Sequence, residues 1–287
     1  MPSLKDIRKR ITSVKNTQKI TRALKLVSAA KLNRSQRALG RLKPYAMKQN
    51  ELISDLVAEV GEEASALFAQ RSDVKRIAAL IVASDRGMCG GFNSNLFKHA
   101  ANYIRNRQAE GAAVVCWSLG RRVEQFVKKE GYEVGGKMGE VLAADLMDRI
   151  PEVAERLISG FTSGEFDEVV IISNRFVNAI TQNPETESYL PVPSLASAGS
   201  ASGDRLYEPG QQNLLDYILP RALETKLRQL IMESITGEHA ARMNAMNNAS
   251  DNAAEMINSL TLAMNRARQA AITTELMEII SGAEALK

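Results

Sequence analysis

The sequence predicts an α/β protein with long helices, in which an antiparallel coiled coil of the N- and C-terminal helices flanks an inserted α/β domain. Three observations support this prediction. Apolar residues recur at spacings of three and four residues at both ends of the chain. Strand-like and helix-like patterns alternate in the middle. Aromatic residues are only 5% of the 287 residues, so aliphatic side chains supply most of the apolar surface, which favours helices.

The first helix of the coiled coil is predicted over residues 1–62. Its seam begins with Leu4, Ile7, Ile11 and Val14 and resumes from Leu32 to Val60. Between these stretches, the regular phase would place polar Gln18 and Thr21 in the seam. We therefore predict a stutter that brings in apolar residues instead, namely Ile20, Leu24 and Val27. Pro44 is expected to kink the helix or to end its first half.

The second helix of the coiled coil is predicted over residues 209–287. Its seam is assigned to Ala249, Ala253, Met256, Leu260, Ala263, Ala267, Ala270, Thr274 and Met277. These side chains are mostly small, so a partner helix or an encircling protein can come close. Pro220 is expected to mark a helix start or a kink. Because both segments flank one compact domain, antiparallel pairing is the simplest topology.

The middle of the chain, residues 74–193, is predicted to be a Rossmann-like α/β domain. Continuous apolar runs predict buried strands over 76–84, 112–118 and 167–173. Helices are expected over about 94–108, 121–129 and 140–160. This alternation indicates βαβ units in a parallel sheet with right-handed crossovers. A segment rich in Ser, Ala and Gly follows, and residues 194–208 are assigned to a linker or foot.

Charge is unevenly distributed along the chain. Residues 1–48 contain 14 Lys and Arg residues and one acid, Asp6, a net charge of +13. Since the whole chain carries +4, the remaining residues carry −9. This asymmetry predicts an acidic partner for the N-terminal helix, with a solvated helix face as the alternative. A nucleic-acid partner is less favoured, because Tyr45 is the only aromatic residue available for base stacking in this segment.

Residues suited to catalysis are sparse. The loop from Ser84 to Asn93 joins a strand to a helix and contains three glycines, so it is a candidate phosphate loop or a tight turn. It matches neither common nucleotide-binding motif, and the turn is preferred. His99 and His239 are far apart, and Cys89 is more typical of a small buried thiol. We therefore predict no catalytic, cofactor-binding or metal site.

Neither a signal peptide nor a membrane-spanning segment is expected. The start, MPSLKDIRKR, has basic residues without an apolar core, and no apolar run approaches about 18 residues. Two cysteines without metal-ligand spacing suggest a reducing environment.

Four motifs, in order along the chain, carry a family resemblance. They are IRKRITSVKNTQKITRALKLVSAAKL at 7–32, SDRGMCGGFNSNLF at 84–97, LYEP at 206–209 and the stretch from Ile272 to Ala285. The last has Ile-Thr-Thr-Glu, a second acid three residues later and then Gly-Ala. Together they resemble the gamma subunit of F-type ATP synthases, over the whole chain.

The resemblance implies a central rotor shaft that couples proton transport to ATP synthesis or hydrolysis. The implied partners are the alpha and beta subunits of the alpha3-beta3 hexamer, the epsilon subunit and the c ring. Nucleotides would bind to those other subunits, so no nucleic acid, cofactor or catalytic residue is implied for this chain. The implied location is the cytoplasmic face of the bacterial inner membrane, reached only through the complex.

The resemblance also implies contact residues. Arg242, Arg268 and Gln269 match positions that touch the beta subunit, and Leu24 and Lys25 would lie near its levers. The alternative for the first three is exposed helix surface.

Tyr207 and Glu208 match the foot that contacts the c ring and epsilon, and the alternative is a simple turn before the long helix. Two other readings of the whole chain remain open. One is a nucleotide-binding α/β protein with a coiled-coil arm, and the other is a nucleic-acid-binding coiled coil.

Overall fold

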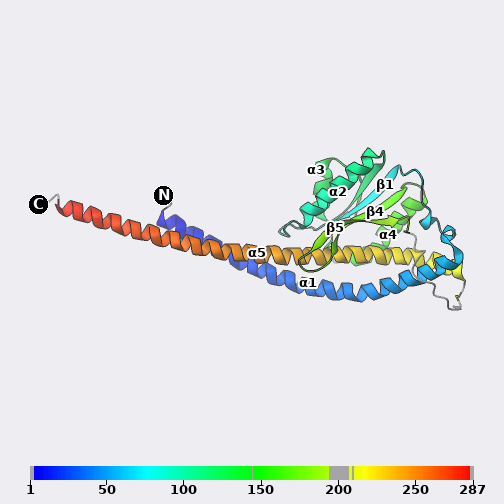
Figure 1. Ribbon diagram of the computed structural model, residues 1–287, viewed down its shortest axis with the longest axis horizontal. Helices are drawn as coiled ribbons and strands as arrows, with labels where there is room; N and C mark the ends of the chain where they lie inside the picture. Colours follow the sequence, from blue (N-terminus) through cyan, green and yellow to red (C-terminus); the bar gives the residue numbers. More distant parts are fainter. Residues whose placement is uncertain (1–2, 144, 194–206, 209, 285–287) are drawn as a thin grey trace. The chain divides into compact units, whose positions relative to one another are not determined.

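The structure is a computed structural model that describes residues 3–143, 145–193, 207–208 and 210–284 (Figure 1). It contains two compact units. One combines Met1–Ala29 with Arg242–Lys287, and the other is Ala30–Ala241. We call them the terminal unit and the central unit. Most of the predicted linker, residues 194–208, lies outside the described residues.

Two long helices contribute to both units. Helix α1 is Leu4–Val60 and helix α5 is Gln211–Glu284. Pro44 and Pro220 lie inside them, so the alternatives that a helix ends at Pro44 or begins at Pro220 are wrong. A proline leaves the carbonyl four residues earlier without its amide partner. Both prolines are exposed, so water can bind that carbonyl and the helix can continue.

The helices pair in antiparallel fashion within each unit. In the terminal unit, Gln18 donates a hydrogen bond to the Ser250 carbonyl and Lys25 donates one to Asn247. The residue numbers therefore rise along α1 as they fall along α5. The central unit shows the same order, with Lys43 near Glu233 and Glu59 bonded to Gln211. The predicted fold class is confirmed, including the antiparallel direction that the flanking topology favoured.

The seam of α1 keeps its regular phase, so the predicted stutter is wrong. Thr21 and Ser28 are buried in the terminal unit, whereas Ile20 and Val27 are 61% and 54% exposed. Leu24 is half-buried. A regular repeat fixes which positions face the partner helix, and local bonds make polar residues tolerable there. Thr21, for example, donates its hydroxyl to the Gln18 carbonyl at 3.0 Å.

The seam of α5 is predicted correctly at Ala249, Ala253, Leu260 and Ala267, whereas Thr274 and Met277 are exposed and the prediction there is wrong. Ala253 is buried and both Leu260 and Ala267 are half-buried, as expected. The intermediate positions are wrong by one residue: Met256, Ala263 and Ala270 are exposed, whereas Ile257, Met264 and Ala271 are half-buried. Both members of each adjacent pair are apolar, so hydrophobicity could not distinguish a step of three from a step of four.

Five strands form one sheet in the central unit, in the order β3-β2-β1-β4-β5. They are β1 Arg76–Val82, β2 Ala113–Leu119, β3 Glu133–Lys137, β4 Glu168–Phe176 and β5 Gln182–Leu190. The three predicted strands are confirmed. The entirely parallel sheet is a wrong prediction, because β5 runs antiparallel to β4. Strands β3 and β5 lie at the edges, β3 largely exposed and β5 mostly half-buried, and both lack the apolar runs that mark the buried strands.

Helices cover both faces of this sheet (Figure 1). Helices α2, Phe92–Ala109, and α3, Arg121–Glu130, pack on the face that carries Ile77, Ala79 and Ile81. Helix α4, Leu146–Thr162, and the central-unit parts of α1 and α5 pack on the face that carries Ala78, Leu80 and Val82. Strand β1 is therefore apolar on both sides. Two short 3-10 helices, Glu62–Ala64 and Ala66–Phe68, follow α1.

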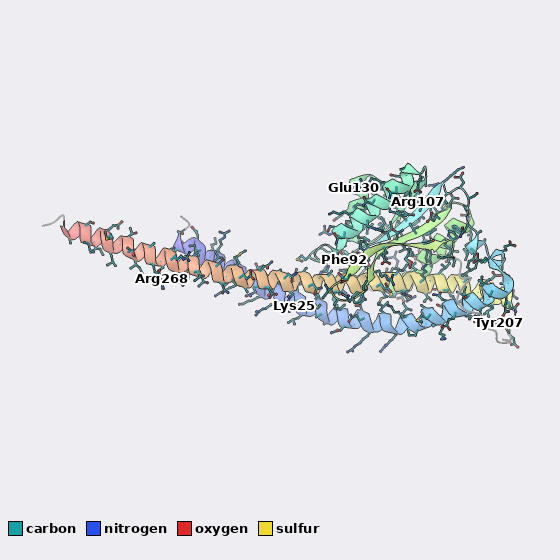
Figure 2. All side chains as sticks on the ribbon, viewed as in Figure 1. Lys25, Phe92, Arg107, Glu130, Tyr207 and Arg268 are labelled. Carbon is teal, nitrogen blue, oxygen red and sulfur yellow. The ribbon has the colours of Figure 1, made fainter. Side chains whose placement is uncertain are left out.

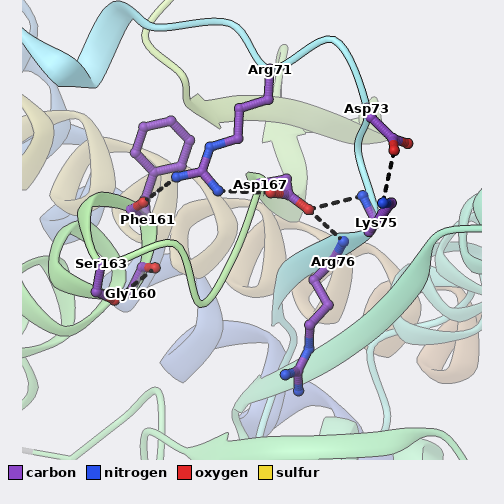
Figure 3. Close-up of polar contacts among 8 residues, drawn as sticks. All are labelled: Arg71, Asp73, Lys75, Arg76, Gly160, Phe161, Ser163 and Asp167. Carbon is purple, nitrogen blue, oxygen red and sulfur yellow. Dashed lines mark hydrogen bonds and ion pairs between the residues drawn. The ribbon is translucent and has the colours of Figure 1, made fainter.

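Asp167 joins the segment before β1 to the end of α4 (Figure 3). Its carboxylate accepts hydrogen bonds from the Arg71 guanidinium at 2.7 Å and from the backbone amides of Lys75 and Arg76 at 2.8 Å each. Arg71 also donates to the Phe161 carbonyl at 2.8 Å. Burial raises the pKa of Asp167, but the hydrogen bonds from Arg71 and the two amides outweigh it and lower the pKa overall.

Candidate interaction surfaces

The loop from Ser84 to Asn93 is built as a turn. The Ser84 hydroxyl donates to the Arg86 carbonyl at 2.7 Å, and the Asn93 amide donates to the Ser84 hydroxyl at 2.7 Å. Met88 and Gly90 adopt left-handed conformations, with φ of 62° and 59°. The side chains of Ser84 and Asn93 therefore bind the loop itself, which supports the turn over the phosphate loop.

Asp85 connects this turn to the start of α3. Its carboxylate accepts from the backbone amides of Arg121 at 3.2 Å, Val141 at 3.2 Å and Leu142 at 2.9 Å. Gly120 precedes α3 with φ of 106°, and a Cβ there would lie 2.2 Å from the Ala83 carbonyl oxygen. The motif at 84–97 thus binds two other backbone segments of the central unit, one at Arg121 and one at Val141–Leu142.

Gly237 lets α5 approach the α/β domain. A Cβ at this position would lie 3.2 Å from the Phe92 ring and 3.2 Å from Gln182 Cγ. Phe92 begins α2 and Gln182 begins β5, so a small residue is needed where the three elements meet. Gly237 therefore occupies a close contact, and α5 continues through it.

The basic N-terminal residues form a surface. All 14 Lys and Arg residues of 1–48 are exposed except Lys25, which is half-buried. Within the described residues, Lys43 and Lys48 are the members of this set that pair with a carboxylate, at 3.8 Å from Glu233 and 2.5 Å from Glu51. Most of the positive charge of α1 is therefore not paired with a carboxylate in the described part of the chain. These cations remain available to bind an acidic partner.

Apolar side chains are exposed on both helices of the terminal unit. On α1 they are Ile20, Leu26 and Val27, each more than half exposed. On α5 they include a cluster near the end of the helix, Ile272, Leu276, Met277, Ile279 and Ile280, which are 50% to 68% exposed. Exposed apolar groups of this density mark surfaces that other proteins cover. These apolar residues of α1 are visible in the sequence, but the predicted stutter assigned two of them, Ile20 and Val27, to the seam instead of the surface.

The predicted contact residues fall in both units. Arg268 and Gln269 are exposed on α5, and Figure 2 shows the Arg268 site on that helix. Arg242 is half-buried in the same unit. Lys25 uses its ammonium within the helix pair, donating to Asn247 Oδ1 at 2.6 Å. Sequence reasoning missed Asn247 and Ser250, because a polar seam position on one helix does not reveal its partner on the other.

Tyr207 and Glu208 differ in exposure. Tyr207 is half-buried and packs against the hydrophobic core of the central unit, whereas Glu208 is exposed. The Tyr207 ring is therefore anchored to the core, and the neighbouring Glu208 side chain faces solvent.

In the described ranges there is no group of three His, Cys, Asp or Glu side chains placed to hold a metal ion. None of the helices traced in the structure combines the length and the apolar character that a bilayer-spanning helix requires.

Together, these observations define the class of protein. It combines an α/β domain with a pair of antiparallel helices, and it is distinguished by exposed cations and exposed apolar side chains. The family follows from comparison with known proteins. The ATP synthase family profile matches residues 3–286. The ATP synthase gamma chain of Chloroflexus aurantiacus is 41% identical over 288 residues, covering 100% of this chain and 99% of the relative. That of Trichlorobacter lovleyi is 43% identical, and both chains are covered completely. The chain belongs to the ATP synthase gamma-chain family.

Solved structures share the fold at low sequence identity. A chain from the Euglena gracilis mitochondrial ATP synthase, in a structure of OSCP, F1 and the c-ring, aligns with a TM-score of 0.68 and 18% identity. The alignment covers 99% of this chain and 94% of that one. A chain from the Tetrahymena thermophila central stalk and c-ring aligns with a TM-score of 0.60 and 20% identity, over 80% and 99% of the two chains.

Proposed function

We propose that this chain is the central rotor shaft of an F-type ATP synthase, coupling ATP synthesis or hydrolysis to proton transport. The observation that carries the proposal is identity of 41% to 43% with ATP synthase gamma chains over the full length of the chain. The structure supplies the mechanical element that the role needs. Two paired helices resist bending and twisting better than one, because each deformation must break contacts along the seam.

The proposed partners are the alpha and beta subunits of the alpha3-beta3 hexamer, the epsilon subunit and the c ring. The exposed cations of α1 suit an acidic surface on the beta subunit. Contacts between exposed charges act at close range without deep pockets, so they can break and re-form as a shaft turns. The exposed apolar residues 272–280 suit a sleeve of partner side chains around the end of α5.

Individual contact residues are assigned by the family resemblance. Arg268 and Gln269 are proposed to touch the beta subunit, and their exposure on α5 supports this. Arg242, Leu24 and Lys25 are proposed for the same subunit with part of each side chain accessible. Tyr207 and Glu208 are proposed for the c ring and epsilon.

The proposed domain division follows the same assignment. It places a coiled-coil helix at 1–62, the α/β domain at 74–193, the foot at 194–208 and the second coiled-coil helix at 209–287. The chain is proposed to be non-catalytic on its own and to reside at the cytoplasmic face of a bacterial inner membrane as part of the complex. Its role would then be to move partners rather than to bind nucleotide.

Reconstitution tests this function directly. The chain should be mixed with purified alpha and beta subunits, and ATP hydrolysis and complex formation measured. Association with a change in turnover is expected, and no association or unchanged turnover would contradict the proposal. Nucleotide titration of the isolated chain addresses the alternative, a nucleotide-binding α/β protein. ATP binding at micromolar concentration by the chain alone would favour that alternative.

A further inference from the structure

We propose that the groove between α2 and α3 is a docking site for an acidic, amphipathic helix of another polypeptide in the assembled enzyme. The groove has a volume of ≈ 600 Å³, which lies within the roughly 300–1,000 Å³ typical of ligand sites. It lies on the face of the sheet opposite α4 and α5 in the central unit (Figure 1). The contacts proposed above for the shaft do not use this groove.

The charges of the groove define the sign of its partner. Four cations line it, Lys98, Arg105, Arg122 and Lys129, against one acid, Glu130, which is labelled at the end of α3 in Figure 2. Within the described residues, none of the four forms an ion pair with a carboxylate. Such uncompensated charge along one groove attracts an acidic surface and disfavours a basic one.

The arginines of the groove are held in place by neutral groups. Arg105 donates to Asn102 Oδ1 at 2.6 Å, and Arg122 donates to Gln125 Oε1 at 3.1 Å. These bonds orient the guanidinium groups without neutralising them. Each guanidinium keeps further N–H donors for a partner carboxylate, which it can bind in bidentate fashion.

The floor of the groove is apolar. Phe97 and Phe126 stack with ring centroids 4.6 Å apart and planes inclined by 4°, and Tyr132 packs edge-on against Phe126 at 5.8 Å. Phe97 and Phe126 remain partly exposed, and Ala101 lies between the cations on α2. An apolar stripe with cations along it matches a helix that has an apolar face and acidic flanks.

The shape of the groove favours a helix over other acidic partners. Its α2 wall runs from Ser94 to Arg105 with side chains at spacings of three and four. These twelve residues span about 17 Å, roughly three helical turns. Both walls are helices, so there is no strand edge to extend, and helix-in-groove binding is the matching mode. A nucleic acid is less suited, because Phe97 and Phe126 cover one face of each other and leave less ring surface for stacking bases.

Crosslinking in the assembled enzyme tests the occupant. Ala101→Cys would place a thiol on the groove floor, where benzophenone maleimide can be attached. The native cysteines should compete poorly, because Cys89 and Cys116 are 2% and 0% exposed and burial raises the pKa of Cys116 to about 12. Ser163→Cys, exposed just after α4, is the matched control. After irradiation of membranes containing the full complex, mass spectrometry would identify the crosslinked segment.

An adduct to an acidic helical segment is expected from Ala101→Cys, with at least about fivefold greater yield than from the control. The double variant Lys98→Glu, Arg122→Glu should reduce this yield at least about fivefold, whereas Lys98→Arg, Arg122→Lys should retain it. If charge reversal prevents assembly, raising the salt concentration on the Ala101→Cys enzyme should produce the same loss.

Several results would overturn the proposal. They are an adduct yield no higher than the control, an adduct to a basic or neutral segment or to nucleic acid, or a yield unaffected by charge reversal and salt. ATP hydrolysis and its coupling should be measured on the same membranes. If hydrolysis stays coupled but no acidic adduct forms, the docking proposal for the groove is wrong and the proposed shaft function stands. If coupling is absent with the unmodified chain, the proposed shaft function itself is contradicted.

Discussion

Lys25 donates a hydrogen bond across the helix pair to the side-chain amide of Asn247, with 2.6 Å between Nζ and Oδ1. Lys25 occupies a regular seam position, four residues after Thr21 and three before Ser28. A polar pair at such a position fixes the register of two helices, because a slip would leave both groups without their partner. The pair therefore sets the alignment of α1 with α5 in the terminal unit.

Removing either partner of this pair should destabilise the terminal unit. We expect Lys25→Ala and Asn247→Ala to be non-additive, with a coupling free energy of about 0.5 to 1.5 kcal/mol for a partly buried, charge-assisted bond. Urea unfolding of the two single variants and the double variant measures this coupling. Lys31→Ala, which removes an exposed lysine of the same helix, is the control and should show no coupling to Asn247→Ala. Additive effects of Lys25→Ala and Asn247→Ala would mean that the bond does not contribute.

The exposed apolar residues of α1 should matter for assembly and little for folding. Ile20→Ser and Val27→Ser are expected to change the free energy of unfolding of the isolated chain by less than about 0.5 kcal/mol, because neither side chain lies in the seam. Both should weaken association with the alpha and beta subunits. The contrast is Ile11→Ser, which replaces a residue that is 8% exposed and should lower stability by about 2 kcal/mol or more. Unchanged association for both exposed variants would contradict the prediction.

Two glycines should respond in opposite directions to alanine. Gly40 lies inside α1, and an added Cβ would meet nothing within 4 Å, so Gly40→Ala should stabilise the chain by roughly 0.5 to 1 kcal/mol. Gly120 has φ of 106° and an added Cβ would overlap the Ala83 carbonyl. Gly120→Ala should therefore cost about 2 to 4 kcal/mol. Thermal unfolding distinguishes these outcomes, and equal effects of the two changes would refute the assignment.

The Asp167 cluster should make stability fall in acid. The pKa of this carboxyl is lower in the folded chain than its usual value of about 3.9. The stabilisation is therefore present above about pH 4 and is lost as the pH falls through the folded-state pKa. Asp167→Asn should lower stability at neutral pH by about 1 to 2 kcal/mol and flatten this acid-side dependence.

Urea unfolding as a function of pH measures this effect. Glu165→Gln, which removes a partly exposed carboxylate that pairs with Arg156, is the control and should change stability little. If Asp167→Asn leaves the slope between neutral and acidic pH unaltered, another group is responsible for the acid sensitivity.

Arg268 and Gln269 should affect coupling without affecting folding. Both are exposed on α5, so Arg268→Ala and Gln269→Ala are expected to leave the unfolding midpoint within experimental error of the parent chain. In the reconstituted complex, each should weaken assembly or the coupling of hydrolysis to proton transport. Normal assembly and coupling in both variants would remove these residues from the proposed contact.

The sequence was sufficient for the main architecture because its strongest signals are local. The buried strands around Ala79, Cys116 and Ile171 are continuous apolar runs, and such runs predict strands covered on both faces. Edge strands β3 and β5 carry no such signal, because their sequences are rich in polar residues and glycine and so resemble loops. The antiparallel direction of β5 therefore came only from the structure.

The seams show where local pattern fails. At Met256 and Ile257, either residue could fill the next seam position by hydrophobicity, and only the geometry of the pair selects Ile257. At Gln18 and Thr21, the apolar neighbour Ile20 suggested a stutter, but the partner helix supplies Ser250 and the regular phase persists. The apolar residues that lie outside the regular seam, such as Ile20, are therefore exposed on the surface of the helix.

The sequence by itself determined that two long helices flank an α/β domain, and its motifs placed the chain in a family. Only the tertiary structure decided which side chains the helices bury, because packing depends on both members of a pair while a sequence pattern describes one. That choice placed Lys25 against Asn247 and exposed Ile20 and Val27. It also brought Lys98 and Arg122, from helices apart in sequence, to one groove.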